Sequence, residues 1–249
     1  MRLAGRLAYD GTLYCGFQRQ RADLISIQAA VEQALTQVTG ENITITGAGR
    51  TDTGVHASGQ VIAFDVTWKH TTEELLKAIN VHLPSDIALQ SLREVVGSFH
   101  PRYDALSRTY LYRLYISPTR DPLRERYAWH RQLPLQLEAM QDAIQLLHGE
   151  HDFATFGQPP KKGETTVRVM NLTQIEAVGD ELQVTLTANA FLKRMVRSIV
   201  GTLVEVGRGK MNVAAFAAAF RSANRQAAGT SAPPHGLTLT HVVYKDYQF

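Results

Sequence analysis

The sequence of 249 residues has little cysteine and no long apolar stretch. A single cysteine, Cys15, excludes an internal disulfide and a cysteine-based metal cluster. No apolar run approaches the roughly 18 residues that cross a membrane. The first residues, MRLAGRLAYDG, lack the apolar core of a signal peptide. We therefore expect a cytoplasmic protein without membrane association.

The excess of positive over negative charge is also small, since the formal net charge is only +3. The basic residues are nevertheless 19 Arg against 7 Lys, and the guanidinium group is the better bidentate ligand for phosphate. Residues 100–131 hold seven Arg and only three acidic residues. This local excess predicts a basic surface for a nucleic acid, although a solvated charged face would look the same in sequence.

Several cofactor motifs are missing as well. The chain has no zinc-ligand spacing, no Walker loop and no dinucleotide-binding fingerprint. Gly47-Ala48-Gly49-Arg50 lacks the third glycine of that fingerprint and does not open a predicted helix. We therefore expect no metal and no organic cofactor.

The first part of the chain alternates between predicted strands and helices. Strands are predicted at residues 2–10, 43–46, 60–66 and 87–96. Ser26 and Gly40 bracket a helical pattern, and Thr71-Thr72-Glu73-Glu74 has the form of a capping box that opens another. The order β-α-β-β-α-β is that of a ferredoxin-like half-domain.

The pattern begins again after residue 101. We predict a strand at 108–117, a helix from Leu137, a hairpin around Gly179-Asp180, helices at 191–206 and 212–222, and a closing strand at 237–244. The predicted fold class is therefore α+β, with two ferredoxin-like (β-α-β-β-α-β) half-domains at residues 1–101 and 102–249.

The residues suited to chemistry gather in a glycine-rich loop (residues 47–59). Asp52 there could act as a nucleophile or base, or it could only bond its own backbone in a turn. Arg50 could contact substrate phosphate, or it could be an ordinary surface arginine. His56 has no second titrating group beside it in sequence, which favours a structural or RNA-contacting role.

Two further candidates lie in the second half. Tyr110, in a predicted strand, could stack on a base that has been extruded from a stem, or it could be a core residue. Arg197, with Lys193 and Arg194, lies near the start of a predicted helix, where cations oppose the helix dipole. RNA phosphate would offset this unfavourable interaction for Lys193 and Arg194. A buried carboxylate would offset it for Arg197, and we favour Asp52 as that carboxylate.

One stretch resembles a known family. The run Gly-Arg-Thr-Asp-x-Gly-Val-His-Ala at residues 49–57 resembles the catalytic loop of the TruA family of tRNA pseudouridine synthases. The resemblance extends over nearly the whole chain. Its other motifs are Tyr9-Asp10-Gly11-Thr12, Gly16-Phe17-Gln18, Phe99-His100-Pro101-Arg102, Arg108-Thr109-Tyr110, Asn189-Ala190-Phe191, Met195-Val196-Arg197, Ala232-Pro233-Pro234 and Gly236-Leu237.

The resemblance implies isomerisation of uridine to pseudouridine at positions 38, 39 and 40 of the tRNA anticodon stem-loop. It implies that Asp52 is catalytic, that Tyr110 stacks on the target base and that Arg197 pairs with Asp52. It also implies a homodimer without cofactor, and one large antiparallel sheet with a central cleft between the half-domains. From other classes, a non-catalytic RNA-binding protein and an aspartate-nucleophile hydrolase of small molecules stay open as alternatives.

Overall fold

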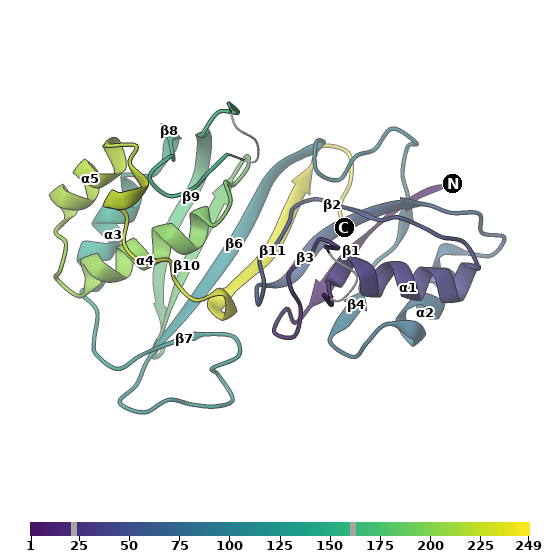
Figure 1. The fold of residues 1–249 in the computed structure, drawn as a ribbon, viewed down its shortest axis with the longest axis horizontal. Helices are drawn as coiled ribbons and strands as arrows, with labels where there is room; N and C mark the ends of the chain where they lie inside the picture. Colours follow the sequence, from purple (N-terminus) through teal and green to yellow (C-terminus); the bar gives the residue numbers. More distant parts are fainter. Residues whose placement is uncertain (21–23, 160–162) are drawn as a thin grey trace. The chain divides into compact units, whose positions relative to one another are not determined.

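The computed structural model describes residues 1–20, 24–159 and 163–249, and its chain divides into two compact units (Figure 1). The first unit is Met1–Leu106 together with Thr238–Phe249, and the second is Ser107–Leu237. The predicted boundary at residue 101 lies close to this division. The prediction placed the closing strand in the second half, whereas residues 238–249 belong to the first unit.

The first unit contains an antiparallel sheet and two helices. Its elements are β1 (Arg2–Tyr9), α1 (Ile27–Thr39), β2 (Thr46–Gly47), β3 (His56–Asp65), α2 (Thr72–His82), β4 (Ile87–Leu89), β5 (Arg93–Glu94) and most of β11 (Leu237–Tyr244). The strand order is β4-β1-β3-β11, with β2 beside β3 and β5 beside β1. Only β11 runs parallel to its neighbour β3, pairing Thr238 with His56 and Leu239 with Ala57. This pairing over a long sequence separation places the closing strand in the first unit.

Both helices of the first unit begin as their sequences predict. The Ser26 side chain accepts a hydrogen bond from the Ala29 amide at 3.3 Å, and Gly40 ends α1 with a φ of 75°. Thr71 and Glu74 form the predicted capping box of α2. The two helices pack against each other (Figure 1).

The second unit also combines a sheet with helices. Its elements are most of β6 (Ala105–Ile116), β7 (Trp129–Arg131), α3 (Leu137–Gln145), β8 (Gly149–Asp152), β9 (Val167–Val178), β10 (Glu181–Ala188), α4 (Met195–Gly207), α5 (Val213–Arg221) and two short 3-10 helices, Arg225–Ala227 and Pro234–Gly236. The order β6-β10-β9-β8 is antiparallel, and β7 runs parallel to β6. The hairpin predicted around Gly179-Asp180 joins β9 to β10.

These elements confirm the α+β fold class, but three local predictions were wrong. The strand predicted at 43–46 is reduced to β2, and the one at 87–96 is divided into β4 and β5. The helix predicted from residue 191 begins only at Met195, because Arg194 adopts a left-handed backbone with a φ of 62°. Lys193 and Arg194 therefore precede the helix instead of opposing its dipole from within the first turn.

Two further findings complete the fold. In the polar segment of residues 157–166, for which the sequence predicts a turn-rich loop, residues 160–162 lie outside the described part of the chain. In the ranges that the structure describes, no helix is long and apolar enough to cross a membrane.

Candidate active site

The glycine-rich loop connects β2 to β3 and carries Asp52 at a turn. The backbone amide of Val55 donates to the carbonyl of Asp52 at 3.1 Å, which closes residues 52–55. Asp52 is half-buried, whereas its neighbour Thr51 is buried and Thr53 is exposed. The Thr51 side chain is therefore enclosed by the protein, whereas that of Thr53 faces solvent.

The segment after β1 anchors this loop through hydrogen bonds. The Tyr9 Oη and Thr51 Oγ1 atoms share a buried hydrogen bond of 2.8 Å. The Phe17 amide donates to the Thr51 carbonyl at 3.1 Å, and the Gly54 amide donates to the Tyr14 carbonyl at 3.4 Å. These bonds reach the loop on both sides of Asp52 and hold its backbone in place.

Two glycines of the same segment allow the close approach. A Cβ on Gly11 would lie 2.0 Å from the Val55 carbonyl oxygen, and a Cβ on Gly16 would lie 2.7 Å from the Thr51 carbonyl oxygen. Gly16 also has a φ of 90°, which L side chains rarely adopt. The motifs around Gly11 and Gly16 therefore support the loop rather than the substrate directly.

His56 is part of the same anchor. Its ring is buried, and its Nδ1 accepts a hydrogen bond from the Gly11 amide at 3.1 Å. The same nitrogen lies 3.1 Å from an Asp10 carboxylate oxygen. Because these contacts join β3 to the turn after β1, they favour the structural role that the sequence suggested for His56.

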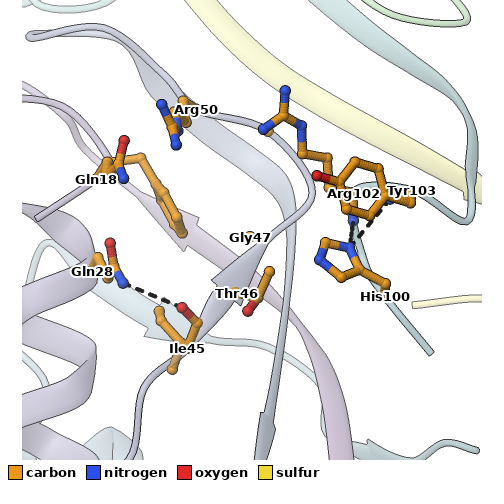
Figure 2. A pocket seen from close by; sticks show the side chains of 11 residues that line it. Gln18, Gln28, Ile45, Thr46, Gly47, Arg50, His100, Arg102 and Tyr103 are labelled. Atoms are coloured by element: carbon orange, nitrogen blue, oxygen red, sulfur yellow. Dashed lines mark hydrogen bonds between the residues drawn. The ribbon is translucent and has the colours of Figure 1, made fainter. Parts of the chain in front are cut away.

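Arg50 lies two residues before Asp52 and faces a surface pocket of about 180 Å³ (Figure 2). The Arg50 side chain is exposed at its rim together with that of Arg102. The pocket is lined by Phe17, Gln18, Gln28, Ile45, Thr46, Gly47, Gly49, Arg50, His100, Arg102 and Tyr103. Sequence reasoning did not bring these residues together, because they come from four separate segments. The sequence signal for this pocket was the run His100-Pro101-Arg102-Tyr103, in which an aromatic side chain follows a basic one.

Tyr110 lies in the second unit, on β6. It pairs with Leu186 of β10, and its ring meets that of Phe191 edge-on, with ring centroids 5.0 Å apart. Only 8% of Tyr110 is exposed. The Phe191 ring therefore fixes the orientation of the Tyr110 ring within this unit.

Arg197 lies in the first turn of α4, also in the second unit. Its Nε donates to the Ala232 carbonyl at 2.8 Å, and the Ala232 amide donates to the Arg197 carbonyl at 2.9 Å. The segment around Thr230 approaches α4 closely, because a Cβ on Gly201 would lie 1.8 Å from the Thr230 carbonyl oxygen. Two reciprocal hydrogen bonds and a close backbone contact thus hold the Arg197 side chain.

The positive charge of Arg197 also acts on Tyr112, whose phenol donates to the Pro233 carbonyl at 2.9 Å. Burial raises the pKa of Tyr112 well above its ordinary value, and the Arg197 guanidinium opposes this rise. Tyr112 therefore stays neutral and serves as a hydrogen-bond donor in this unit.

The predicted site residues thus fall into two groups. Asp52 and Arg50 share the glycine-rich loop of the first unit, and Tyr110 and Arg197 belong to the second. The pairing of Asp52 with Arg197 and the central cleft stay predictions. In the described parts of the chain, no cluster of three or more His, Cys, Asp or Glu could hold a metal ion.

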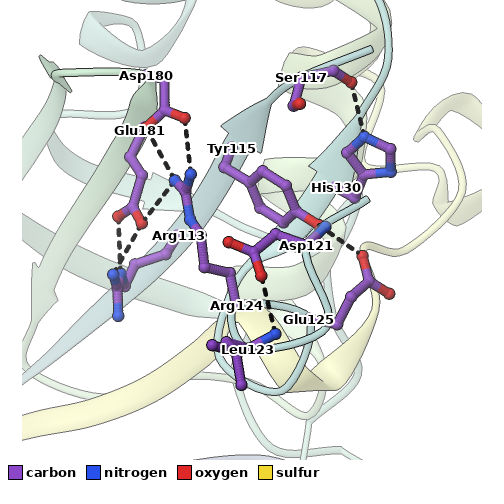
Figure 3. Close-up of polar contacts among 10 residues, drawn as sticks. All are labelled: Arg113, Tyr115, Ser117, Asp121, Leu123, Arg124, Glu125, His130, Asp180 and Glu181. Carbon is purple, nitrogen blue, oxygen red and sulfur yellow. Dashed lines mark hydrogen bonds and ion pairs between the residues drawn. The ribbon is translucent and has the colours of Figure 1, made fainter. Parts of the chain in front are cut away.

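The arginine-rich window of residues 100–131 is more neutral than its sequence suggests. Arg113 contacts Glu181 at 2.8 Å, and Arg124 bonds both Asp180 and Glu181, at 2.6 and 2.9 Å (Figure 3). Burial would raise the pKa of Glu181, but hydrogen bonds from Arg113 and Arg124 bring it below its ordinary value. Both acids lie outside the window, so two of its arginines stabilise the fold instead of offering charge to RNA.

Comparisons with known proteins identify the family of the chain. The protein family described as tRNA pseudouridine synthase matches residues 7–104 and 143–245. The chain belongs to the tRNA pseudouridine synthase family. It is therefore an isomerase that converts uridine to pseudouridine in tRNA.

Individual relatives match this tRNA pseudouridine synthase over almost their full length. The chain is 45% identical to tRNA pseudouridine synthase A of Brevibacillus brevis, over 98% of this chain and 99% of that protein. It is 40% identical to the protein of the same name from Neisseria gonorrhoeae, over 98% of this chain and 92% of that protein. These matches confirm the family resemblance and leave the roles of single residues to be tested.

Proposed function

We propose that this tRNA pseudouridine synthase modifies uridines 38, 39 and 40 of the anticodon stem-loop, with Asp52 as its nucleophile. The observation that carries the proposal is the placement of Asp52. It is the one carboxylate in residues 47–59, it is half-buried, and the backbone on both sides of it is anchored. A carboxylate held in this way is suited to covalent catalysis.

The reaction needs few groups. The Asp52 carboxylate attacks either C1′ of the ribose or C6 of the uracil ring, and the bond between N1 and C1′ breaks. The detached uracil rotates and its C5 forms the new bond to C1′, and the bond between the Asp52 oxygen and the substrate breaks, which releases the carboxylate. The proton on C5 then leaves, and N1 gains one. No atom is added or lost, which agrees with the expectation that no cofactor takes part.

Three other residues would support this chemistry. Tyr110 would stack on the extruded uracil and relay the C5 proton, since its ring is held in one orientation by Phe191. Arg197 would pair with Asp52 and keep the carboxylate ionised, and its Nε bond to Ala232 fixes the position of the guanidinium. Arg50 would bind substrate phosphate.

The wider setting is part of the same proposal. We expect a homodimer, with one tRNA contacting both subunits, that works in the cytoplasm. The homodimer and its contact with one tRNA are what the family resemblance implies, and the cytoplasmic location is the expectation drawn from the sequence composition. Size-exclusion chromatography with light scattering, with and without tRNA, tests the oligomeric state.

Asp52→Asn and Asp52→Ala test the nucleophile directly. Using unmodified tRNA with uridines in the anticodon arm, we expect both variants to bind tRNA like the parent protein and to form no pseudouridine. The matched control is Glu94→Gln, an exposed carboxylate on β5, which should keep full activity.

Three outcomes would contradict the proposal. Pseudouridine formation by Asp52→Ala would exclude Asp52 as the nucleophile. Pseudouridine found only outside positions 38–40, by mapping modified sites in the product, would show that another part of tRNA is the substrate. A parent protein that binds tRNA without forming pseudouridine would support the RNA-binding alternative.

A further inference from the structure

The pocket beside Arg50 combines basic and aromatic side chains on the surface of the first unit. Arg50 and Arg102 extend along one rim, and His100 and Tyr103 lie on the side opposite Gln18 (Figure 2). Its volume of about 180 Å³ is below the roughly 300–1,000 Å³ of sites that enclose a small molecule. The pocket therefore suits one part of a larger ligand.

Tyr103 lies on a turn that several hydrogen bonds hold rigid. The His100 amide donates to the Asp104 carboxylate at 2.8 Å, and the Asp104 amide donates to the His100 carbonyl at 3.0 Å. His100 Nδ1 accepts hydrogen bonds from the amides of Arg102 and Tyr103, at 3.2 and 3.3 Å. The rings of His100 and Tyr103 lie 4.2 Å apart, yet 75% of Tyr103 stays exposed. A rigid aromatic face open to solvent is what base stacking requires.

The charges at the pocket indicate an anionic ligand. Both guanidinium groups at the rim, those of Arg50 and Arg102, can bind phosphate oxygens in the bidentate manner. Arg102 also lies over the Tyr103 ring, at 5.7 Å from its centroid. The lining residues contribute no acidic side chain. A phosphate bound by Arg102 would therefore lie close to a base stacked on Tyr103.

The pocket wall is continuous with the support of Asp52. Phe17 lines the pocket, and its amide donates to the Thr51 carbonyl at 3.1 Å. Gly49 also lines the pocket, and its carbonyl accepts a hydrogen bond from the Gln60 side chain at 2.8 Å. The pocket and the residue before Asp52 are thus parts of one rigid frame within the first unit.

We infer that this pocket binds the nucleotide next to the target uridine in the RNA strand, with its base stacked on Tyr103 and its phosphate bound by Arg102. This inference rests on the proposed function, because it takes Asp52 as the reacting group. Stacking tolerates any base, so the pocket would give affinity and register without reading the sequence.

Tyr103→Ala tests the inference, with tRNA affinity and steady-state kinetics as readouts. We expect Kd and KM to rise by roughly fivefold or more, at the lower end of the range for stacking one base. The rate at saturating tRNA should stay within about twofold, because the contact is the same in the ground and transition states. Tyr103→Phe should restore affinity. Lys77→Ala, an exposed cation on α2, is the control.

A modified substrate makes the test independent of protein folding. Two tRNAs are compared, each with an abasic nucleotide on one side of the target uridine. For one of these two tRNAs, the difference in Kd between the parent protein and Tyr103→Ala should disappear. For Arg102→Ala, the slope of log Kd against log salt should fall by about 0.7–0.9, which corresponds to one phosphate contact.

Two results would overturn the inference. One is an unchanged Kd for Tyr103→Ala with a parent protein that forms pseudouridine, which leaves the proposed function intact. The other is a loss of affinity that persists with both abasic substrates, because the effect would then be structural. Failure of the proposed function is distinguishable, since it appears as missing or misplaced pseudouridine with the parent protein itself.

Discussion

Gly11→Ala is a test of whether the segment after β1 positions the glycine-rich loop. The added Cβ would lie 2.0 Å from the Val55 carbonyl oxygen, and ordinary contacts begin at 3.4 Å. One of the two backbones must therefore move by about 1.4 Å. Val55 closes the turn with Asp52 through a 3.1 Å hydrogen bond, so a shift of Val55 reaches the carboxylate.

The expected cost has two separate parts. Overpacking of this kind destabilises a fold by about 1–3 kcal/mol. A displacement of about 1 Å of a reacting group lowers the rate about 100-fold. We therefore expect the rate of pseudouridine formation at saturating tRNA to fall about 100-fold, with a protein that still unfolds cooperatively and binds tRNA.

The assay compares this variant with Gly97→Ala. A Cβ on Gly97 would meet nothing within 4 Å, and Gly97 has no positive φ, so neither its rate nor its unfolding temperature should change. The reasoning is refuted if Gly11→Ala loses stability but keeps its rate within twofold. In that case the loop would hold Asp52 independently of the segment after β1.

Two further predictions concern the second unit. Gly201→Ala should displace the segment around Thr230 and disturb the hydrogen bond between Arg197 and Ala232. The rate of pseudouridine formation should then fall at least tenfold. An unchanged rate would show that this segment does not position Arg197. Arg124→Ala should cost about 1–2 kcal/mol of unfolding free energy, because it leaves the mostly buried Glu181 with fewer donors. The pKa of Glu181 in the folded protein lies below its ordinary value. The loss of unfolding free energy in Arg124→Ala should therefore be full above pH 4.5 and shrink as the pH falls below it. A loss that does not depend on pH would contradict the ion-pair explanation.

The elements that the sequence predicted well are those with local chemical signals. The Ser26 cap, the Thr71–Glu74 capping box and the turn at Gly179-Asp180 each need only a few neighbouring residues. The left-handed backbone of Arg194 has no such signal, because the apolar pattern continues through it. The pairing of β11 with β3 depends on residues about 180 positions apart, which a local pattern does not contain.

The same distinction applies to the candidate site. The glycine-rich loop is one continuous stretch, so its residue types could be recognised together. Its supports at Tyr9, Gly11 and Phe17 come from another strand and loop, and sequence reasoning gave them no role beyond the family resemblance. The basic window was overestimated for a related reason, because its neutralising acids, Asp180 and Glu181, are distant in sequence.

The hydrogen bonds that hold the loop around Asp52 determine whether the protein or the RNA must rearrange when the two form the reactive complex. The anchors act on the backbone of residues 49, 51 and 54, so this part of the loop is ordered when the protein folds. The carboxylate is then already in position when RNA arrives, and little conformational entropy is lost by the loop on binding. In the proposed reaction, in contrast, the target uridine must leave its stack to reach Asp52. Contacts with neighbouring nucleotides, such as the stacking proposed for Tyr103, would supply the free energy for that step. Their loss would therefore weaken binding without changing the chemistry at the carboxylate.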